Sequence, residues 1–332
     1  MGTYCQEIPH VRMRWILTAS AVSAFLGPDV ASAQQHMNPV VDLLAAKKPV
    51  FGLYAPTNRR AGRGGTATPP DSMKSPAQLA ADAVAHKNID YIFDGSMEGN
   101  YDTAVPVFAE FAKGMQSAGF IVNKRFTHPI FIKTPEIAPD YDTAGKRIAD
   151  QLNLGVSSIV FVGVESADEA HRGLNMMRFK SKGGTRPDNV GDAPARWGMT
   201  EKEYKEKADL WPLNPKGELV NMSIVESKEG LAHVREIAAV KGIGVLFPGA
   251  GTLRGVFSTT DAAGKRVLDE KGWEGAIQQV LAACKEFNVP CGYPAGEADI
   301  EMRMKQGFSV FVIGWGEPGF RAVDIGKKVG GR

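Results

Sequence analysis

The stretch that decides the fold runs from Val220 to Gly251 and reads VNMSIVESKEGLAHVREIAAVKGIGVLFPGAG. It opens with a short apolar run, Val220 to Val225, which can be buried on both faces as a strand of a parallel sheet is. Apolar residues then recur at helical spacing, a Lys-Gly pair closes the helix, and Ile243 to Phe247 forms a second apolar run. This order of strand, helix and strand indicates an α/β fold.

Glu226 stands directly after the first apolar run, at the carboxyl end of the predicted strand. The carboxyl ends of parallel strands are where α/β folds place their binding and catalytic residues. Acids are also favoured at helix N-termini, so the alternative is that Glu226 only opens the helix. The residue pattern alone leaves both interpretations open.

The same alternation of apolar runs and helical stretches fills most of the chain. Eight runs are predicted as buried strands: Val50–Tyr54, Ile89–Phe93, Ile130–Lys133, Ser158–Val162, Val220–Val225, Gly244–Phe247, Val289–Tyr293 and Phe308–Ile313. Eight strands alternating with helices predict a (β/α)8, or TIM, barrel of one domain over residues 34–332. The alternative is an open doubly wound sheet, which usually has fewer strands and a phosphate-binding glycine fingerprint that this sequence lacks.

Composition narrows the functional classes. The 332 residues are 43% hydrophobic, which suits a large core, and the formal net charge of +2 offers no electrostatic reason to expect a nucleic-acid partner. The N-terminus has the pattern of an export signal: basic Arg12 and Arg14, apolar Trp15–Leu26, then Ala31-Ser32-Ala33. We therefore expect a signal peptide over residues 1–33 and a periplasmic or secreted protein; an amphipathic N-terminal helix is the alternative. The apolar run is too short to span a membrane.

Cys284 and Cys291 are the two cysteines of the expected mature chain, since Cys5 leaves with the signal. An oxidising compartment would permit a disulfide between them. Cys284 falls in a helical run and Cys291 near the next strand, and such neighbours often point apart. We therefore expect two buried thiols rather than a bridge.

A family resemblance rests on several segments of this sequence. They are Gly163–Ala170, Gly184–Arg186, Ala195–Trp197, Ile224–Ser227, Glu236-Ile237, Val240–Ile243, Phe247–Leu253 and Asn288–Gly314. These segments resemble the HpcH/HpaI aldolase/citrate lyase family of metal-dependent aldolases, and the resemblance covers about residues 40–323. It implies a (β/α)8 barrel, a small carboxylate or keto-acid substrate, and a divalent metal ion, Mg²⁺ or Mn²⁺, with Glu226 as one ligand. It also implies a trimer or hexamer, with the insertion Ser181–Asn214 reaching between subunits.

The chain departs from this family at catalytic positions. Asp94-Gly95-Ser96-Met97 stands where the family has Asp-Gly-Glu-His, so the proposed acid/base histidine is absent. Lys133 replaces an arginine and keeps the charge without the bidentate fork. Thr252 replaces the second metal-binding aspartate and would bind Mg²⁺ or Mn²⁺ more weakly than a carboxylate.

Candidate site residues follow from strand ends and from this resemblance. Glu165 follows the fourth strand, beside the strand that carries Glu226, although it could instead open a helix. We assign Lys133 and Asp94 to catalysis, Lys133, Arg186, Arg196, Gly249 and Thr252 to substrate binding, and Glu226 with Glu165 to the metal.

Three functions compete on this basis. The first is a metal-dependent carbon–carbon lyase acting on a keto acid or related small carboxylate. The second is a barrel with altered, for example hydrolytic, chemistry, and the third is a non-catalytic periplasmic protein that binds a small ligand. Fold alone cannot choose among them. A lyase requires two or more oxygen ligands within coordinating reach around Glu226, whereas a binding protein would have an apolar or arginine-lined cavity with Glu226 neutralised by a basic partner.

Overall fold

The computed structural model describes residues 1–3, 35–58 and 72–332. The chain divides into two units, Met1–Gln35 and His36–Arg332, and the helices and strands of the described residues belong to the second. The predicted signal peptide, residues 1–33, lies outside the described residues except for the first three. Within the described ranges, no helix has the length and apolarity needed to cross a membrane.

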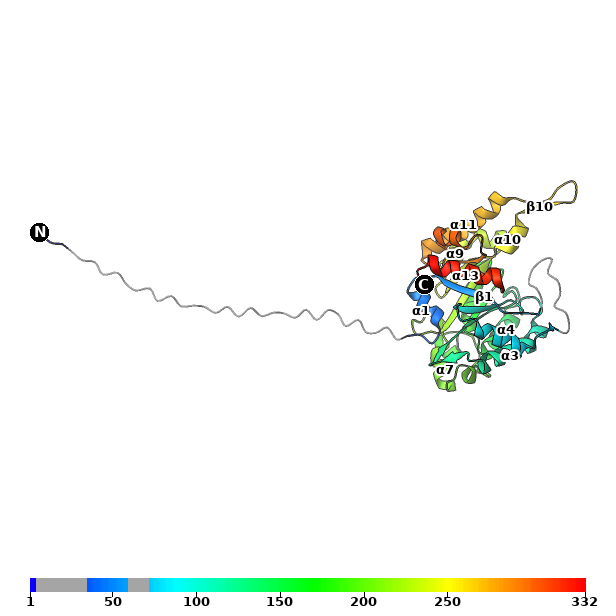
Figure 1. Ribbon diagram of the computed structural model, residues 1–332, viewed down its shortest axis with the longest axis horizontal. Coiled ribbons are helices and arrows are strands. Elements are labelled where there is room, and N and C mark those ends of the chain that lie inside the picture. The colour runs from blue at the N-terminus through cyan, green and yellow to red at the C-terminus, as the bar shows by residue number, and fades with distance from the viewer. Residues whose placement is uncertain (4–34, 59–71) are drawn as a thin grey trace. The chain divides into compact units, whose positions relative to one another are not determined.

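Parallel strands form the centre of the second unit (Figure 1). In the described ranges, eight strands of the nine-stranded main sheet form the barrel: β1 (Val50–Tyr54), β2 (Tyr91–Asp94), β5 (Ile130–Lys133), β6 (Ser158–Phe161), β8 (Leu219–Val225), β9 (Val245–Pro248), β12 (Gly292–Ala295) and β13 (Val310–Ile313). They pair in the order β12-β13-β1-β2-β5-β6-β8-β9. A bridge between Leu246 of β9 and Cys291 joins the two ends of this order. The strands therefore close into a ring, and the predicted (β/α)8 barrel is confirmed.

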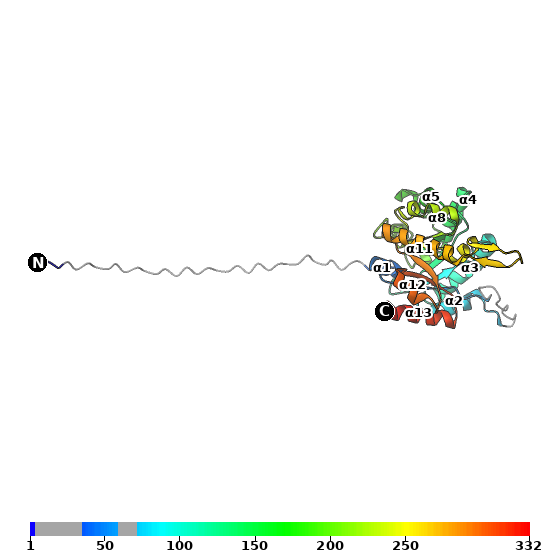
Figure 2. The ribbon, with the colours of Figure 1, turned by 90° about the horizontal axis from the view of Figure 1, so that it is seen from above.

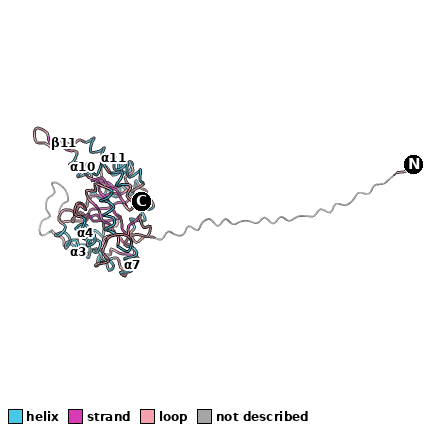
Figure 3. The backbone as a smooth tube through the Cα atoms, turned by 180° about the vertical axis from the view of Figure 1, so that it is seen from behind, coloured by secondary structure: helices cyan, strands magenta, loops and turns pink. Residues whose placement is uncertain are grey.

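Each barrel strand is followed by one or two helices, which surround the strands when viewed from above and in the tube drawing (Figures 2 and 3). In chain order they are α2 (Pro76–Ala85), α3 (Tyr101–Ser117), α4 (Tyr141–Asn153), α5 (Ala167–Met177), α8 (Lys228–Ala232) with α9 (Val234–Ala238), α10 (Ala250–Val256) with α11 (Glu270–Phe287), α12 (Ile300–Gln306) and α13 (Glu317–Val329). The helical stretch of the opening sequence is thus two short helices that meet at His233.

Several short elements decorate the barrel. They are α1 (Pro39–Ala45), the hairpins β3–β4 (Ile121–Val122 and Arg125–Phe126) and β10–β11 (Ser258–Thr260 and Arg266–Leu268), the 3-10 helix η2 (Lys180–Lys182), α6 (Ala193–Arg196), α7 (Glu201–Lys207) and β7 (Leu210–Trp211). The insertion Ser181–Asn214 is thereby ordered, and it packs on its own barrel: Trp197 is buried and its Nε1–H donates to the carbonyl of Gly155, 2.9 Å away.

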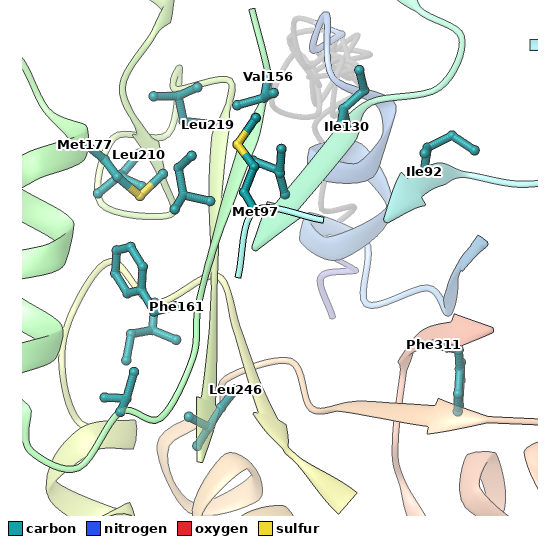
Figure 4. Close-up of a cluster of buried hydrophobic side chains, with 14 of the residues drawn as sticks. Ile92, Met97, Ile130, Val156, Phe161, Met177, Leu210, Leu219, Leu246 and Phe311 are labelled. Carbon is teal, nitrogen blue, oxygen red and sulfur yellow. The ribbon is translucent and has the colours of Figure 1, made fainter. Parts of the chain in front are cut away.

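Two separate apolar cores show how the strand residues are partitioned. The inner core includes Tyr91, Phe93 and Phe131, with the alternate residues of the other strands, and Val40 of α1 packs into the same cluster. The outer core lies between strands and helices, and its side chains include Phe161, Met177 and Leu246 (Figure 4). Because successive strand residues point to opposite faces, this partition assigns every strand position to the barrel interior or to the helices.

The two cysteines form a disulfide, so the expectation of two free thiols was wrong. Helix α11 ends at Phe287, and Asn288 adopts a left-handed conformation with φ of 53°. This residue turns the chain back on the helix and brings the Cα atoms of Cys284 and Cys291 to 5.6 Å. That separation lies within the range that a disulfide spans.

A paired arginine between α11 and α12 should make a large contribution to stability. Arg303 is buried, donates to both carboxylate oxygens of Glu274, and lies over the ring of Tyr293. Arg303→Ala should lower the free energy of unfolding by about 1–3 kcal/mol, because it removes this packing and leaves Glu274 unpaired. The exposed pair Arg321–Glu297 has a similar two-oxygen geometry and is the matched control.

Arg321→Ala should change the free energy of unfolding by less than about 1 kcal/mol, since exposed ion pairs contribute little. Urea unfolding followed by circular dichroism measures both variants. Equal effects of the two substitutions would contradict the argument from burial.

Candidate functional site

The inward-facing residues at the carboxyl ends of the strands define the candidate site. The inner core takes alternate residues from β1, β5 and β8, so the last inward positions on these strands are Tyr54, Lys133 and Glu226. They come from the first, third and fifth barrel strands, which is how one layer of a TIM-barrel interior is built. After β2 and β9 the corresponding positions are Gly95, which leaves space beside Lys133 and Tyr54, and Gly249, whose space the Glu226 side chain occupies.

Glu226 is held in place by two glycines. Its Oε1 accepts a hydrogen bond from the backbone N–H of Gly163 at 3.2 Å. Gly249 packs against the other side, where an added Cβ would lie 2.5 Å from Glu226 Oε2. Among the described residues no basic side chain pairs with this carboxylate. Glu226 is therefore a positioned carboxylate whose charge is free to meet a cation.

Lys133 lies in the same layer but already has an acidic partner. Its Nζ is 2.8 Å from Glu98 Oε2, and the Lys133 side chain is 14% exposed whereas that of Glu98 is 41% exposed. The backbone carbonyl of Lys133 accepts a hydrogen bond from Gln151 Nε2 at 2.9 Å. This hydrogen bond fixes the end of β5. The ammonium group of Lys133 pairs with Glu98 and also lines the cavity above the barrel.

Asp94 and Tyr54 both have raised pKa values, which is common for residues of a catalytic or binding site. Burial raises the pKa of the Asp94 carboxyl, and the hydrogen bonds from Ser96 oppose that shift only in part. Burial also raises the pKa of the Tyr54 phenol, and the negative charges of Glu98 and Glu226 raise it further. Tyr54 therefore stays protonated at neutral pH and acts as a hydrogen-bond donor, while Asp94 is a stronger base than an ordinary aspartate.

A cavity of about 370 Å³ opens beside Lys133. It lies at the carboxyl ends of β1, β2 and β5 and reaches the first turn of α2 and the side of α3. Its polar lining includes Tyr54, Thr57, Asp94, Ser96, Glu98 and Lys133, and its apolar lining includes Pro76, Leu79, Val107, Phe108 and Phe111. The structure therefore brings the two predicted catalytic residues, Lys133 and Asp94, to one cavity.

The predicted metal ligands are not equally placed. Glu226 faces the barrel mouth, whereas the Glu165 side chain is exposed at the start of α5, and the Glu165 carbonyl contacts His233 Nδ1 at 3.1 Å. The described ranges contain no group of three or more His, Cys, Asp and Glu side chains that could enclose a metal ion. Mg²⁺ often keeps several waters while one or two carboxylates hold it. The donors therefore fit an open site centred on Glu226 and do not fit a closed protein cage.

Arg186 and Arg196 lie elsewhere, so the structure does not support their assignment to substrate binding. Arg186 is 1% exposed, donates to Asn153 and Tyr204, and its guanidinium stacks on Phe179. Arg196 is also buried and packs against Gly155. Asn153 and Gly155 precede β6, so both arginines are at the amino ends of the strands. They stabilise the folded insertion.

Gly249 and Thr252 also take roles other than the predicted substrate contact. The backbone N–H of Gly249 already donates to the carbonyl of Val225, and its missing side chain makes room for Glu226. Thr252 is exposed on α10, one turn after the end of β9. Gly249 is therefore a positioning residue for the carboxylate.

Tyr54 is the site residue that sequence reasoning missed. A tyrosine that ends an apolar strand resembles any other half-buried strand residue. The signal was its place as the last inward residue of the first strand, which is recognisable only once alternate residues are assigned to the barrel interior. Glu98, two residues after Ser96, reaches the site through its contact with Lys133.

Comparison with known proteins identifies the family. A sequence model of the HpcH/HpaI aldolase/citrate lyase family matches residues 136–313. The chain belongs to this family. The matched HpcH/HpaI region contains Glu226 and Gly249, and it begins after Lys133 and Asp94. A hydroxypyruvate/pyruvate aldolase from Paraburkholderia phytofirmans is 30% identical over 105 residues, which are 31% of this chain and 37% of that aldolase. The alignment thus spans little more than a third of the relative.

Solved HpcH/HpaI structures share the barrel. A family protein from Burkholderia cenocepacia superposes with a TM-score of 0.61 and 20% identity, over 83% of this chain and 92% of that one. An HpcH/HpaI aldolase from Desulfitobacterium hafniense superposes with a TM-score of 0.56 and 15% identity, over 82% of this chain and 89% of that one. The CitE protein of Mycobacterium tuberculosis was solved with magnesium and acetate. It superposes with a TM-score of 0.51 and 12% identity, over 87% of this chain and 93% of that one. These identities establish the fold and leave the activity to be argued from the site.

Gly249 offers a direct test of how Glu226 is held. Gly249→Ala should lower the free energy of unfolding by about 1–3 kcal/mol, because the new Cβ would overlap the Glu226 side chain in a buried position. Gly251, two residues on in α10, has open space around it, so Gly251→Ala should be neutral or stabilising by up to about 1 kcal/mol. Thermal unfolding of both variants checks this. A tolerated alanine at position 249 would show that Glu226 is not confined.

Asp94 should make stability depend on pH. Burial raises its pKa in the folded state, so ionised Asp94 opposes folding once the pH exceeds that raised pKa, and the cost vanishes below the pKa of the unfolded chain. Asp94→Asn should therefore raise the Tm at pH 7, and the gain should shrink towards about pH 3.

Asp140→Asn is the control of opposite sign. Hydrogen bonds from Thr143 lower the pKa of Asp140, so its stabilising contribution is present above the unfolded pKa and is lost as pH falls through the lower value. This variant should lower the Tm at pH 7 and converge on the wild type in acid. A fall in Tm at pH 7 for both variants would refute the assigned effect of burial on Asp94.

Proposed function

We propose that this protein is a carbon–carbon lyase that acts on a small keto acid or related carboxylate with the help of a divalent metal ion. The observation that carries the proposal is Glu226, a carboxylate at the barrel mouth that two glycines hold and that has no cationic partner among the described residues. It stands in the segment that matches the family. The magnesium and acetate bound by the CitE protein agree with such a site.

Glu226 would hold the metal ion, with water and substrate oxygens filling the remaining positions. When bound, Mg²⁺ or Mn²⁺ supplies a Lewis acid that stabilises an enolate. Hard oxygen donors suit both ions. Gly163 and Gly249 fix the carboxylate in one orientation, so the ion would be set at one place above the inner core.

Lys133 and Tyr54 would bind the oxygen atoms of the substrate. The lysine charge favours a carboxylate or a developing alkoxide, and its pairing with Glu98 holds the side chain in a single position. The protonated phenol of Tyr54 can donate a hydrogen bond to the same ligand. The apolar lining of the cavity, which includes Leu79 and Val107, excludes water from the substituent that the substrate carries.

Asp94 is our candidate for the base that replaces the absent histidine. In a retro-aldol step the base takes the hydroxyl proton of the substrate, the carbon–carbon bond breaks, and its electron pair becomes the enolate of the keto acid. The other half leaves as an aldehyde, and protonation of the enolate completes the reaction. A buried carboxyl with a raised pKa is better suited to accept that proton than an exposed one.

The other two functions receive less support. A non-catalytic binding protein was expected to neutralise Glu226 with a basic partner, and none is present in the described ranges. Altered chemistry would need a different nucleophile, and Lys133 is engaged with Glu98. The proposal includes export to the periplasm or the exterior, which the Cys284–Cys291 disulfide supports. It also includes a homo-oligomer, by resemblance to the family.

Titration of Mn²⁺ into the purified protein tests the metal site. The wild type should bind one equivalent. Glu226→Gln should weaken binding by more than the ~10–100-fold that loss of an outer partner costs, because the amide removes the charged ligand. Glu165→Gln should bind like the wild type, since the Glu165 side chain is exposed. Isothermal calorimetry measures all three, and failure of the wild type to bind would overturn metal dependence.

The same proteins then enter a lyase screen with 4-hydroxy-2-keto acids, followed through the keto acid released. Release should require Mn²⁺ or Mg²⁺. Asp94→Asn should lower kcat by about 10²–10⁴-fold, the usual contribution of a general base, with Mn²⁺ affinity unchanged. Metal binding without any lyase activity would exclude this reaction class while leaving the metal site intact.

A further inference from the structure

A second cavity lies at the opposite end of the barrel from Glu226. Its volume is about 920 Å³, and it is lined by the end of α1 and by the segments that precede β8, β9, β12 and β13. We call it the lower cavity. Its charged lining is Lys47, Lys48, Lys241 and Lys285, and its larger apolar lining includes Trp211, Leu213, Leu281, Phe287, Val289 and Pro290.

The charged side chains that line the lower cavity are all positive. Among the described residues, no carboxylate lines it. Lys47 Nζ donates to the amide oxygen of Asn288, and Lys285 Nζ donates to the carbonyl of Gln306. In the part of the chain that the structure describes, no ion pair involves any of the four lysines. The lysines therefore create an uncompensated positive potential over the cavity.

Two acids near these lysines along the chain have other partners. Asp42 of α1, five residues before Lys47, pairs with Arg125, and Glu286, which follows Lys285 in α11, pairs with Arg235. Neither carboxylate therefore neutralises the lysines of the lower cavity.

The rest of the lower cavity is apolar and firmly held. Leu213 and Phe287 are 41% and 37% exposed, which is high for large apolar side chains. Trp211 packs against the inner core, and the Cys284–Cys291 disulfide fixes the segment between α11 and β12. Exposed apolar surface next to unpaired positive charge favours a ligand that has both an apolar body and an anionic group.

We infer that the lower cavity binds an amphiphilic carboxylate, with its hydrocarbon or aromatic body on Trp211, Leu213 and Phe287 and its carboxylate among the lysines. Burial of the body removes apolar surface from water, and the lysines supply charge-assisted hydrogen bonds to the head group. The lower cavity shares no lining residue with the cavity at Lys133. It is a second site, independent of the proposed lyase reaction.

Decanoate is the probe, titrated calorimetrically into the whole protein at concentrations up to about 1 mM, where a specific site of ordinary affinity is detectable. Acetate, which lacks the body, and decanol, which lacks the charge, are the ligand controls. Lys48→Glu/Lys241→Glu reverses two exposed charges of the cavity, and Phe287→Ser removes apolar lining. Lys113→Glu/Lys271→Glu makes the same charge change on exposed lysines that do not line it.

The inference expects one decanoate per chain, weaker binding of both ligand controls, and a loss of affinity of about tenfold in the Lys48/Lys241 variant. Phe287→Ser should weaken binding to a similar degree, and the Lys113/Lys271 variant should match the wild type. Equal loss in the two charge variants would mean unspecific attraction and would overturn the site. Absence of binding would also overturn it, and so would sedimentation showing that the reversed charges instead dissociate copies of the chain.

Discussion

Packing inside the barrel is the constraint on which the rest of the structure depends. Eight strands can close into a ring only if their inward side chains fill the space between them, and here that filling includes Tyr91, Phe93, Phe131 and Phe247. The hydroxyl of Tyr91 donates to the carbonyl of Phe311, and its ring occupies the position where a side chain on Gly52 would stand. The neighbouring strands β1 and β2 leave space for one large side chain at this level of the inner core, and the ring of Tyr91 fills it.

The same packing places the chemistry. Once Ile224 and Phe131 face inward, the residues two positions later must face the mouth, and these are Glu226 and Lys133. Gly95 adds no side chain to this layer and Gly249 makes room for Glu226, so polar groups meet above an apolar floor. A carboxylate with no cationic partner is unfavourable for folding by itself, and such a residue persists where it serves a ligand.

The fold was largely predictable, and the site only in part. Apolar runs of four to six residues, separated by helical periodicity, predicted the barrel strands because burial on both faces leaves a nearly continuous apolar signature. Asp94 and Glu226 were chosen because they follow such runs, and Lys133 because it ends one where the family has an arginine. Arg186 and Arg196 were misassigned, since an arginine in an irregular insertion looks available for a ligand until its burial against Phe179 or Gly155 is known.

What the sequence by itself determined is the alternation of strands and helices, and with it the end of the barrel at which Glu226 stands. Periodicity carries that information because it is local. Tertiary structure alone decided that Tyr54 joins Glu226 and Lys133, that Cys284 meets Cys291 through the turn at Asn288, and that four lysines gather beneath the barrel without acids. These relations join residues distant along the chain or depend on one backbone turn, and no local pattern records them.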